Sequence, residues 1–415
     1  MLDKWLPIFV HSTKRPRRLY WGKKLQQVSW PIFFWEVEMV GRVCFLLVVS
    51  VVLLFRCAFA YDVTEKFTVD ATLSLVYQKV SLDDQEAQSI GVEDSVGRGS
   101  GTVDLGFNFH PTDVDEFQVT LSFGAGNGLK YTPIFSLATN ADDLESDLKN
   151  INGRDRDYLL EVWYKHTFKL KEDLSISGTI GIIDATQYLD QNPYANDETA
   201  QFMNEVFVNN PVLNLPSYDL GGVLELSFSD LSVKALAMGS RTEDWQAPGA
   251  YRGYGYYGLE LGYKLKDPLG EGNISLLGYT TTKDFVDWQG VKGEALKGFG
   301  LSFGHPITEY LGVFLRGGWQ DDKAQITHQK SYSGGIDISG KLWGREDDNI
   351  GVGYAYLKGP DQGLLDCTHA IEGYAKFKIT NFSHLTFDVQ YLKDKFNDNT
   401  KLDGMVYGVR FVVKF

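Results

Sequence analysis

Apolar and polar residues alternate one by one along most of this 415-residue chain. The first such segment, residues 66–78, reads KFTVDATLSLVYQ. Its odd positions include Phe67, Val69 and Leu73, whereas its even positions are largely polar. Because successive side chains of a strand point to opposite faces, a period of two predicts a strand with one apolar and one polar face. The alternation recurs as far as the C-terminus and predicts about 16 strands.

The connections between these segments alternate between short and long. The short ones are residues 110–116, 169–173, 229–230, 266–272, 305–310, 344–349 and 380–384. The long, mostly acidic ones are residues 81–98, 125–156, 184–218, 239–253, 281–295, 320–331, 358–369 and 393–403. An outer-membrane barrel has short periplasmic turns, long external loops and an even number of strands. We therefore predict an all-β fold, a transmembrane antiparallel β-barrel, with a soluble β-sandwich as the alternative.

The start of the chain does not share this alternation. In residues 39–60, Arg42 precedes an apolar run at 43–55 and Ala58-Phe59-Ala60 follows it, which predicts a cleaved secretory signal peptide. The alternative is an uncleaved helix, although the run is shorter than the roughly 20 apolar residues that cross a bilayer. Residues 1–38 are basic and aperiodic, and we interpret them as an upstream extension. Residues 61–415 then form the barrel domain.

Charge and cysteine content exclude several other functions. The whole chain has a formal charge of −14, and residues 61–415 alone carry 31 Lys/Arg against 51 Asp/Glu. This acidic surplus argues against a nucleic-acid partner. Cys367 is the single cysteine of that part, and its histidines lack the spacing of metal ligands, so we expect no disulfide, metal or cofactor. Ser383-His384 has no evident orienting carboxylate, and we predict that the protein is not an enzyme.

Residues 196–211, NDETAQFMNEVFVNNP, depart from the strand pattern inside a long loop. Four apolar residues from Phe202 to Phe207 recur at helical spacing, Asp197 offers a helix cap, and Asn210-Pro211 offers a stop. We predict one loop, 184–218, folded into the pore, where the apolar side of a short helix packs on the inner wall. The polar residues predicted to form the constriction are Asp197, Glu198, Gln201, Asn204, Glu205, Asn209 and Asn210.

The polar phase of the strands supplies candidate lumen residues. Charged side chains are costly against lipid, so their occurrence in one phase supports a water-filled interior. Arg316 and Arg410 opposite carboxylates would set a transverse field in the pore. Planar hydrogen-bonding groups and an aromatic face are the groups that bind sugars, while a merely solvated wall is the alternative for each residue. The candidates for pore lining and substrate binding are Glu161, Trp163, Arg316, Glu372, Tyr374, Asp388, Gln390 and Arg410.

Three segments carry a resemblance to a known family. The terminal Phe415 resembles the last residue of bacterial porins, which implies that the barrel-assembly machinery reads it. Residues 196–211, LTFDVQYL at 385–392 and HAIEGY at 369–374 resemble the carbohydrate-selective porins. The resemblance implies an outer-membrane homotrimer that passes small sugars or other hydrophilic solutes and contacts lipid and lipopolysaccharide. A general cation-preferring porin and a plugged structural or adhesive barrel are the rival interpretations.

Overall fold

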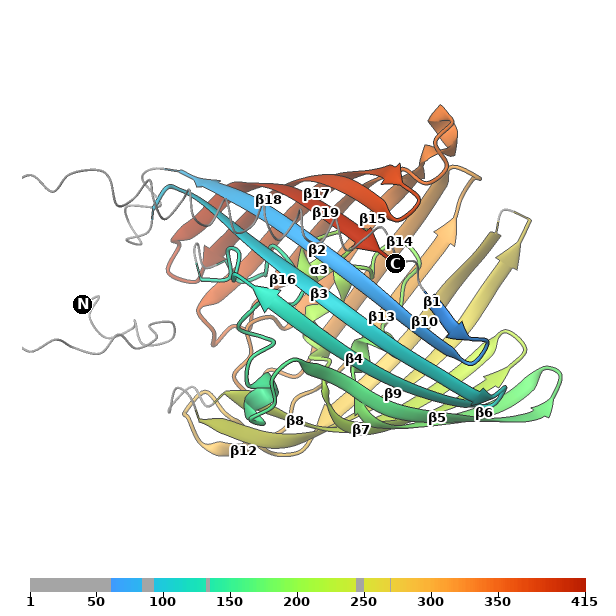
Figure 1. The fold of residues 1–415 in the computed structure, drawn as a ribbon. Helices are drawn as coiled ribbons and strands as arrows, with labels where there is room; N and C mark the ends of the chain where they lie inside the picture. The colour runs from blue at the N-terminus through green and yellow to red at the C-terminus, as the bar shows by residue number, and fades with distance from the viewer. Residues whose placement is uncertain (1–60, 84–92, 132–134, 244–249, 269) are drawn as a thin grey trace, which may run out of the picture.

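The fold was analysed in a computed structural model. It describes residues 61–415 except 84–92, 132–134, 244–249 and 269 (Figure 1). The predicted extension at 1–38 and the predicted signal peptide at 39–60 lie outside the described residues, so both stay predictions. No helix in the described ranges is long and apolar enough to cross a membrane.

Antiparallel strands account for most of the described chain. The first ten are β1 Tyr61–Thr64, β2 Phe67–Leu82, β3 Ser95–Thr112, β4 Asp115–Ala125, β5 Leu159–Lys171, β6 Leu174–Ile183, β7 Asp219–Phe228, β8 Leu231–Glu243, β9 Tyr251–Asp267 and β10 Gly270–Thr281. The remaining ones are β11 Phe285–Val286, β12 Lys292–Glu294, β13 Lys297–Pro306, β14 Leu311–Gln320, β15 Lys330–Ser339, β16 Asn349–Lys358, β17 Leu365–Thr380, β18 Ser383–Phe396 and β19 Lys401–Lys414.

The strands close into one barrel. Each strand from β2 to β10 and from β13 to β19 pairs with its neighbour, and β19 returns to pair with β2, where Val409 lies opposite Tyr77. The result is the predicted closed barrel of 16 antiparallel strands. The short β1 pairs with the start of β2, and β11 and β12 form a small separate sheet in the loop before β13. Closure leaves the described barrel sheet, β2–β10 and β13–β19, without an open edge.

The barrel is apolar outside and polar inside, as the alternation predicted. Ile180 and Tyr77 are 65% and 54% exposed on the outer face, whereas Gln78 and Arg410 are at most 1% exposed on the inner face. Exposed aromatic residues near the short turns are Phe109, Phe168, Phe228, Tyr263 and Phe382, and those nearer the other end are Tyr257, Phe299, Tyr332, Tyr354 and Tyr407. An apolar band between two aromatic girdles is the surface of a membrane barrel.

Several strands extend beyond the roughly 9–11 residues that cross a bilayer. β17 has 16 residues and β18 and β19 have 14 each, so two predicted long loops are shorter than expected. Only residues 359–364 separate β16 from β17, and only 397–400 separate β18 from β19. The extra residues still form cross-strand pairs, for instance Lys358 with Asp366. Pairing of opposite charges across strands stabilises the sheet beyond the membrane.

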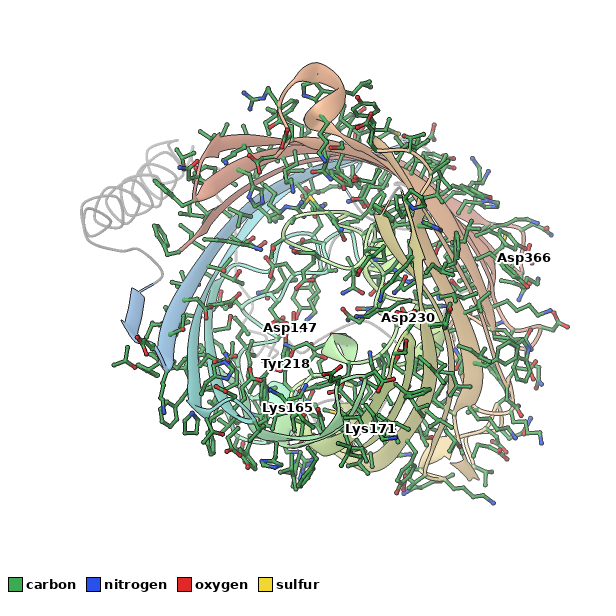
Figure 2. The ribbon with its side chains drawn as sticks, turned by 90° about the vertical axis from the view of Figure 1, so that its right-hand side faces the viewer. Asp147, Lys165, Lys171, Tyr218, Asp230 and Asp366 are labelled. Carbon is green, nitrogen blue, oxygen red and sulfur yellow. The ribbon has the colours of Figure 1, made fainter. Side chains whose placement is uncertain are left out.

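Two loops enter the barrel, one more than predicted. Residues 184–218 contain the helices η2 Ala185–Gln187, α3 Glu205–Val208 and η3 Pro211–Leu213. Residues 126–158 contain η1 Ile151–Gly153, and a fourth short helix, η4 Gly340–Trp343, lies in the turn between β15 and β16. The view along the barrel shows the labelled Asp147 and Tyr218, from these two loops, inside the ring of strands (Figure 2). The two loops fill much of the lumen and position the site.

Candidate pore constriction

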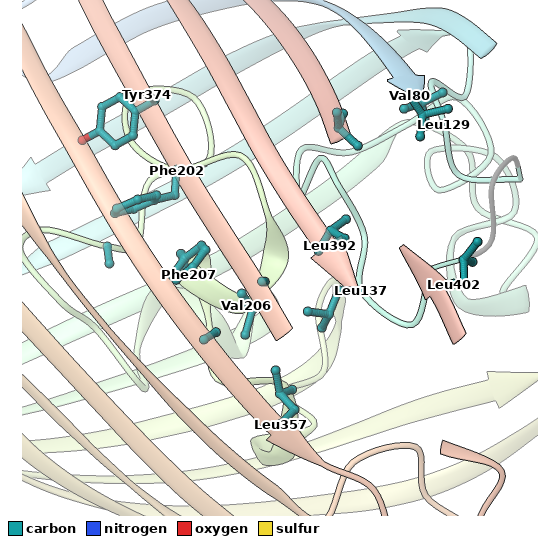
Figure 3. Packing of buried hydrophobic residues seen from close by; sticks show 14 of the residues in the cluster. Val80, Leu129, Leu137, Phe202, Val206, Phe207, Leu357, Tyr374, Leu392 and Leu402 are labelled. Carbon is teal, nitrogen blue, oxygen red and sulfur yellow. The ribbon is translucent and has the colours of Figure 1, made fainter. Parts of the chain in front are cut away.

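An aromatic cluster fixes the loop 184–218 to the inner wall. The rings of Phe202 and Phe207 in the loop lie 4.8 Å apart, centre to centre. The ring of Phe202 is 4.9 Å from that of Tyr374 on β17 and 5.4 Å from that of Phe314 on β14. All four rings are buried, and Figure 3 shows Phe202 and Phe207 packed among the strands. Burying a large apolar side chain stabilises by about 1.5–3 kcal/mol, so this cluster is one apolar anchor of the loop. A second cluster packs Leu189 and Leu213 of the loop against β7–β10.

Glycines of the wall make room for the loop. A Cβ atom at Gly353 would lie 2.7 Å from the ring of Phe207, and one at Gly318 would lie 2.6 Å from both Asn210 and Val212. Real Cβ atoms are not found at such distances, so only glycine at these two wall positions leaves room for the loop. The other wall glycines whose Cβ would approach loop side chains to 3.0 Å or less are Gly258, Gly300, Gly304 and Gly312. Together they form a glycine cradle across β9, β13, β14 and β16.

Glu372 of β17 holds the backbone of the loop. The amides of Met203 and Asn204 donate to its two carboxylate oxygens, at 2.5 and 3.0 Å. Glu372 and Asn204 are fully buried, so neither amide has water as an alternative partner. A hydrogen bond to a charged group contributes about 1.5–3 kcal/mol, and loss of one partner in a buried bond costs the desolvation of the other.

Arg410 and His384 bind the preceding turn of the loop. The guanidinium of Arg410 donates to the carbonyl oxygens of Glu198 and Gln201, the latter at 2.8 Å. Nε2 of His384 lies 3.0 Å from the carbonyl oxygen of Thr199. His384 belongs to β18 rather than to a turn as expected, because Ser383 already pairs with β19. Wall side chains therefore satisfy three carbonyl groups of the loop.

Arg316 of β14 binds the loop at two further points. Its guanidinium donates to the carbonyl oxygens of Phe207 and Asp190, both at 2.7 Å, and its Nε lies 3.4 Å from the Asp190 carboxylate. Both side chains are buried. An uncompensated charge in a buried pair costs about 3–5 kcal/mol, so each partner requires the other. The charges of Arg316 and Arg410 thus lie beneath the loop, and a transverse field from them stays a prediction.

These wall contacts explain why the helix is shorter than predicted. α3 begins at Glu205, with Asn204 as its cap, and ends at Val208. Asp197 does cap a turn, since its carboxylate accepts the amides of Thr199 and Ala200 at 2.8 and 3.0 Å. A continuous helix would direct the amides of residues 203 and 204 to the carbonyls of residues 199 and 200. Glu372 takes those amides instead and interrupts the helix.

The second inward loop, 126–158, packs against the first. The Ala138 amide donates to the Glu205 carboxylate at 2.9 Å, and the Glu205 amide donates to the Ala138 carbonyl at 3.1 Å. The carbonyl of Thr139 accepts Nε2 of both Gln78 and Gln390, at 2.7 and 2.8 Å. Nδ2 of Asn204 donates to the side-chain oxygen Oε1 of Gln390, at 3.0 Å. Gln390 therefore joins both loops to β18.

Ser136 provides the other anchor of the loop 126–158. Its hydroxyl and amide both bond to the Asp394 carboxylate, at 2.7 and 2.6 Å. Thr368 lies 2.7 Å from the same hydroxyl, and the buried His328 lies 3.3 Å from Thr368. Burial lowers the pKa of His328 to about 4, so the ring is neutral at neutral pH. This hydrogen-bonded network fixes the loop 126–158 to β17 and β18.

The opposite wall is more open to the lumen. Lys165 of β5 forms a 3.0 Å ion pair with Glu225 of β7, and the two side chains are 27% and 21% exposed. A second pair, Lys234 of β8 and Glu260 of β9 at 3.4 Å, lies under the loop, where Lys234 donates to the Tyr188 carbonyl and Glu260 accepts the Asp190 amide. Glu161 accepts a 3.2 Å hydrogen bond from Thr120 and is buried. Two lysines and three carboxylates therefore lie along the wall from β4 to β9.

The predicted site residues therefore fall into two groups. Arg316, Glu372, Gln390 and Arg410 contact the loop, and Tyr374 packs on Phe202 and donates to Asp337 at 2.9 Å. Asp388 accepts from Gln390 at 2.9 Å, and Glu161 lies on the opposite wall with the half-buried Trp163. In the loop, Asn204 and Asn210 are buried, whereas the other five predicted residues are partly exposed: Asp197, Glu198, Gln201, Glu205 and Asn209. Substrate binding by any of these residues stays a prediction.

An acidic vestibule lies above the constriction. Its cavity measures about 1920 Å³ and is lined by both inward loops and by the external ends of the strands. Burial raises the pKa of Glu198 to about 8, that of Glu205 to about 7 and that of Asp142 to about 6. Asp142 and Asp197 add to the shift of Glu198 by repulsion. Within the described ranges, no group of three His, Cys, Asp or Glu side chains could hold a metal ion.

Some functional residues escaped the sequence analysis. Asp190 and Thr139 lie in loops without periodicity, and the wall glycines have no side chain to signal a contact. His384 had a detectable signal, since its even number places it in the polar phase of Thr386 and Asp388 on β18. The chain end behaves as expected for a final strand: Phe415 exchanges backbone hydrogen bonds with Ala71. Recognition of Phe415 by assembly machinery stays a prediction.

Comparison with known proteins shows which families and solved structures this barrel is similar to. Residues 304–415 match the family model described as carbohydrate-selective porin, OprB family. An uncharacterized protein of Aquifex aeolicus (strain VF5) is 32% identical over 283 residues, which cover 67% of this chain and 79% of the relative. The high-pH structure of Pseudomonas putida OprB superposes with a TM-score of 0.64 at 15% identity, covering 84% of this chain and 94% of that one. Its low-pH structure gives a TM-score of 0.49. The chain is thus a bacterial porin barrel that resembles the carbohydrate-selective OprB porins, and it belongs to one family with the Aquifex aeolicus protein.

Proposed function

We propose that this porin passes small hydrophilic solutes across the outer membrane by passive diffusion and prefers neutral carbohydrates. One observation carries the proposal: a closed barrel with a polar interior is narrowed by a loop whose partly exposed groups are hydrogen-bonding side chains. Six of the eight predicted pore residues, from Arg316 to Arg410, fall within the part that matches the carbohydrate-selective porin model. The proposal includes no catalytic step.

The geometry favours neutral solutes for a physical reason. The ion pair Lys165–Glu225 balances charge on the open wall, and the charged groups beneath the loop, the pair Lys234–Glu260 and the two arginines, are already bonded. A sugar hydroxyl can replace its hydrogen bond to water with one to the side chain of Gln201 or Asn209. Because the sugar is neutral, it has no ionic hydration shell to lose. Trp163 supplies an aromatic face on the opposite wall. Passage then requires contacts that are favourable and also weak enough to release the solute.

The proposed location implies further partners. The apolar band and the aromatic girdles fit an outer membrane, so lipid and lipopolysaccharide are the expected surroundings. We include the barrel-assembly machinery, through Phe415, and a homotrimer as expected partners. A signal peptide at 39–60 would deliver the chain to the periplasm.

The acidic vestibule favours a second function, a general cation-preferring porin. Asp142, Asp143 and Glu198 line the entrance together, and a mouth lined by one sign of charge concentrates counter-ions. The raised pKa values of Asp142 and Glu198 reduce their negative charge near neutral pH, which weakens this attraction. Two inward loops also fit a plugged structural barrel, which would carry no current.

Single-channel recording in planar bilayers tests these functions together. Current in potassium chloride is measured while glucose and then maltose-series sugars are titrated into one chamber. Saturable block at millimolar sugar is expected if the lumen binds carbohydrate. A cation-selective current that is indifferent to sugar would support the general porin instead, and absence of channels would support the plugged barrel.

A further inference from the structure

A row of lysines crosses the external end of one side of the barrel. Register pairs these residues directly across neighbouring strands from β14 to β19: Trp319, Lys330, Lys358, Cys367, Lys395 and Lys401. Directly opposed residues have Cβ atoms about 4.5–5.5 Å apart. Four ammonium groups are therefore brought onto a strip only six strands wide, in a protein whose formal charge is −14. Lys393 lies in the adjacent row, opposite His369.

The lysine row faces the outside of the barrel. On β15, Tyr332 is 53% exposed on the outer face, and Lys330 is two residues away in the same phase. On β16, Tyr354 is 48% exposed, and Lys358 follows four residues later. Asp366, which bonds to Lys358, lies at the outer edge of the wall in Figure 2. The lysines are thus on the lipid side, not on the pore side.

An aromatic row separates the lysines from the apolar band. Tyr332 and Tyr356 are opposed across β15 and β16, and His369 of β17 continues the row. The Tyr354 hydroxyl lies 3.0 Å from Nδ1 of His369. The order from the membrane centre outward is apolar, aromatic and then basic. Aromatic rings mark the membrane interface, and lysine stems extend from there toward the headgroups.

Carboxylates on this strip neutralise only part of the charge. Asp366 bonds to both Lys358 and Lys395, and Asp403 bonds to Lys401 at 3.0 Å. Lys330 and Lys393 form no ion pair with a described residue of the barrel. Two further carboxylates, Asp361 and Asp398, lie in the loops above the strip. Like charges placed directly opposite are destabilising, so an anion bound beside the row would relieve this repulsion.

We propose that this lysine row binds the phosphate groups of an anionic lipid in the outer leaflet. The inference rests on the proposed membrane location, which puts the row at headgroup depth. A lipid rather than a free phosphate fits, because the aromatic row and the apolar band continue directly below the lysines and would contact the acyl chains. Each basic residue near an anionic membrane surface adds attraction that salt weakens.

Lipid binding to the detergent-purified barrel tests the proposal. The probe is diphosphoryl lipid A, and native mass spectrometry counts the protein-bound lipid. The variant K330Q/K393Q/K395Q removes two charges from the row and that of Lys393 beside it, and leaves Lys358 with Asp366. We expect its affinity to be roughly tenfold weaker than that of the natural sequence. The matched control K169Q/K171Q/K264Q removes three exposed lysines near the short turns and should bind within twofold of the natural sequence.

Four outcomes would overturn the proposal. Unchanged binding in the row variant would show that the lysines do not hold the lipid, and equal loss in the control would show a nonspecific charge effect. Equal binding of dephosphorylated lipid A, or displacement by an equimolar concentration of inorganic pyrophosphate, would exclude a lipid phosphate as the ligand. Conductance in zwitterionic bilayers separates this test from the porin proposal, because the row variant should keep natural conductance even if it loses lipid.

Discussion

The two sides of the barrel wall carry polar side chains in the same phase, but the inward loop covers them unequally. Under the inward loop, Glu372 and Arg410 are fully buried and bond to loop backbone. On the opposite side, Lys165 and Glu225 keep about a quarter of their side-chain surface exposed and form an ion pair with each other. The difference lies in the neighbours, since glycines such as Gly353 leave space for the loop beside the buried charges. Polar phase alone therefore does not decide whether a side chain lines the pore or fixes a loop.

Glu372→Ala should have the largest effect among single substitutions. It removes the partner of two buried amides, at a cost of about 1–3 kcal/mol for each unsatisfied group. The loop should detach, so that single-channel conductance rises and the melting temperature of the folded barrel falls. Glu372→Gln keeps one acceptor oxygen, so its conductance and melting temperature should lie between those of Glu372→Ala and those of the natural sequence. Natural conductance in Glu372→Ala would show that the loop does not depend on this carboxylate.

Gly353→Leu should have the next largest effect. The new side chain would collide with Phe207 and Phe202, and overpacking costs about 1–3 kcal/mol. Conductance should rise because the aromatic cluster is displaced. Gly278→Leu is the matched control, since a Cβ at Gly278 meets no atom within 4 Å. Equal conductance in both variants would refute the role of the glycine cradle.

A pH change should alter the contact between the two inward loops. Burial raises the pKa of Glu205 from 4.5 to about 7, so the folded state binds its proton more tightly than the unfolded state. The stabilising contribution of this group is therefore complete below pH 4.5 and is lost as the pH rises to about 7. Melting temperature should fall between pH 5 and pH 8 by less in Glu205→Gln than in the natural sequence. Identical pH dependence in both proteins would contradict this assignment.

Lys165→Met should have the smallest effect. A partly exposed ion pair contributes about 0–1 kcal/mol, so the melting temperature should change little. Glu225 would lose its partner, and reversal potentials should shift slightly toward cation preference. A large rise in conductance would show that the open wall, rather than the covered wall, sets the constriction.

The sequence predicted the strands well because their signal is local. Alternation in residues 66–78 follows directly from the two faces of β2, and closure of the barrel follows from the alternating connections. The inward loops that cover the inner wall have no such local pattern in the sequence. α3 begins at Glu205 rather than near Asp197 because Glu372, 168 residues away along the chain, takes the Asn204 amide. Inward folding of residues 126–158 depends likewise on Asp394 binding Ser136, a contact across 258 residues.

The central claim is that the loop 184–218, fixed to the inner wall from β8 to β10 and from β13 to β19, sets the width of the pore. Deletion of residues 197–209 removes α3 and the turn capped by Asp197 while leaving every barrel strand intact. Single-channel conductance in potassium chloride should then rise several-fold, and block by glucose should weaken. Conductance equal to that of the natural sequence, in a variant that still migrates as a folded barrel, would contradict the account.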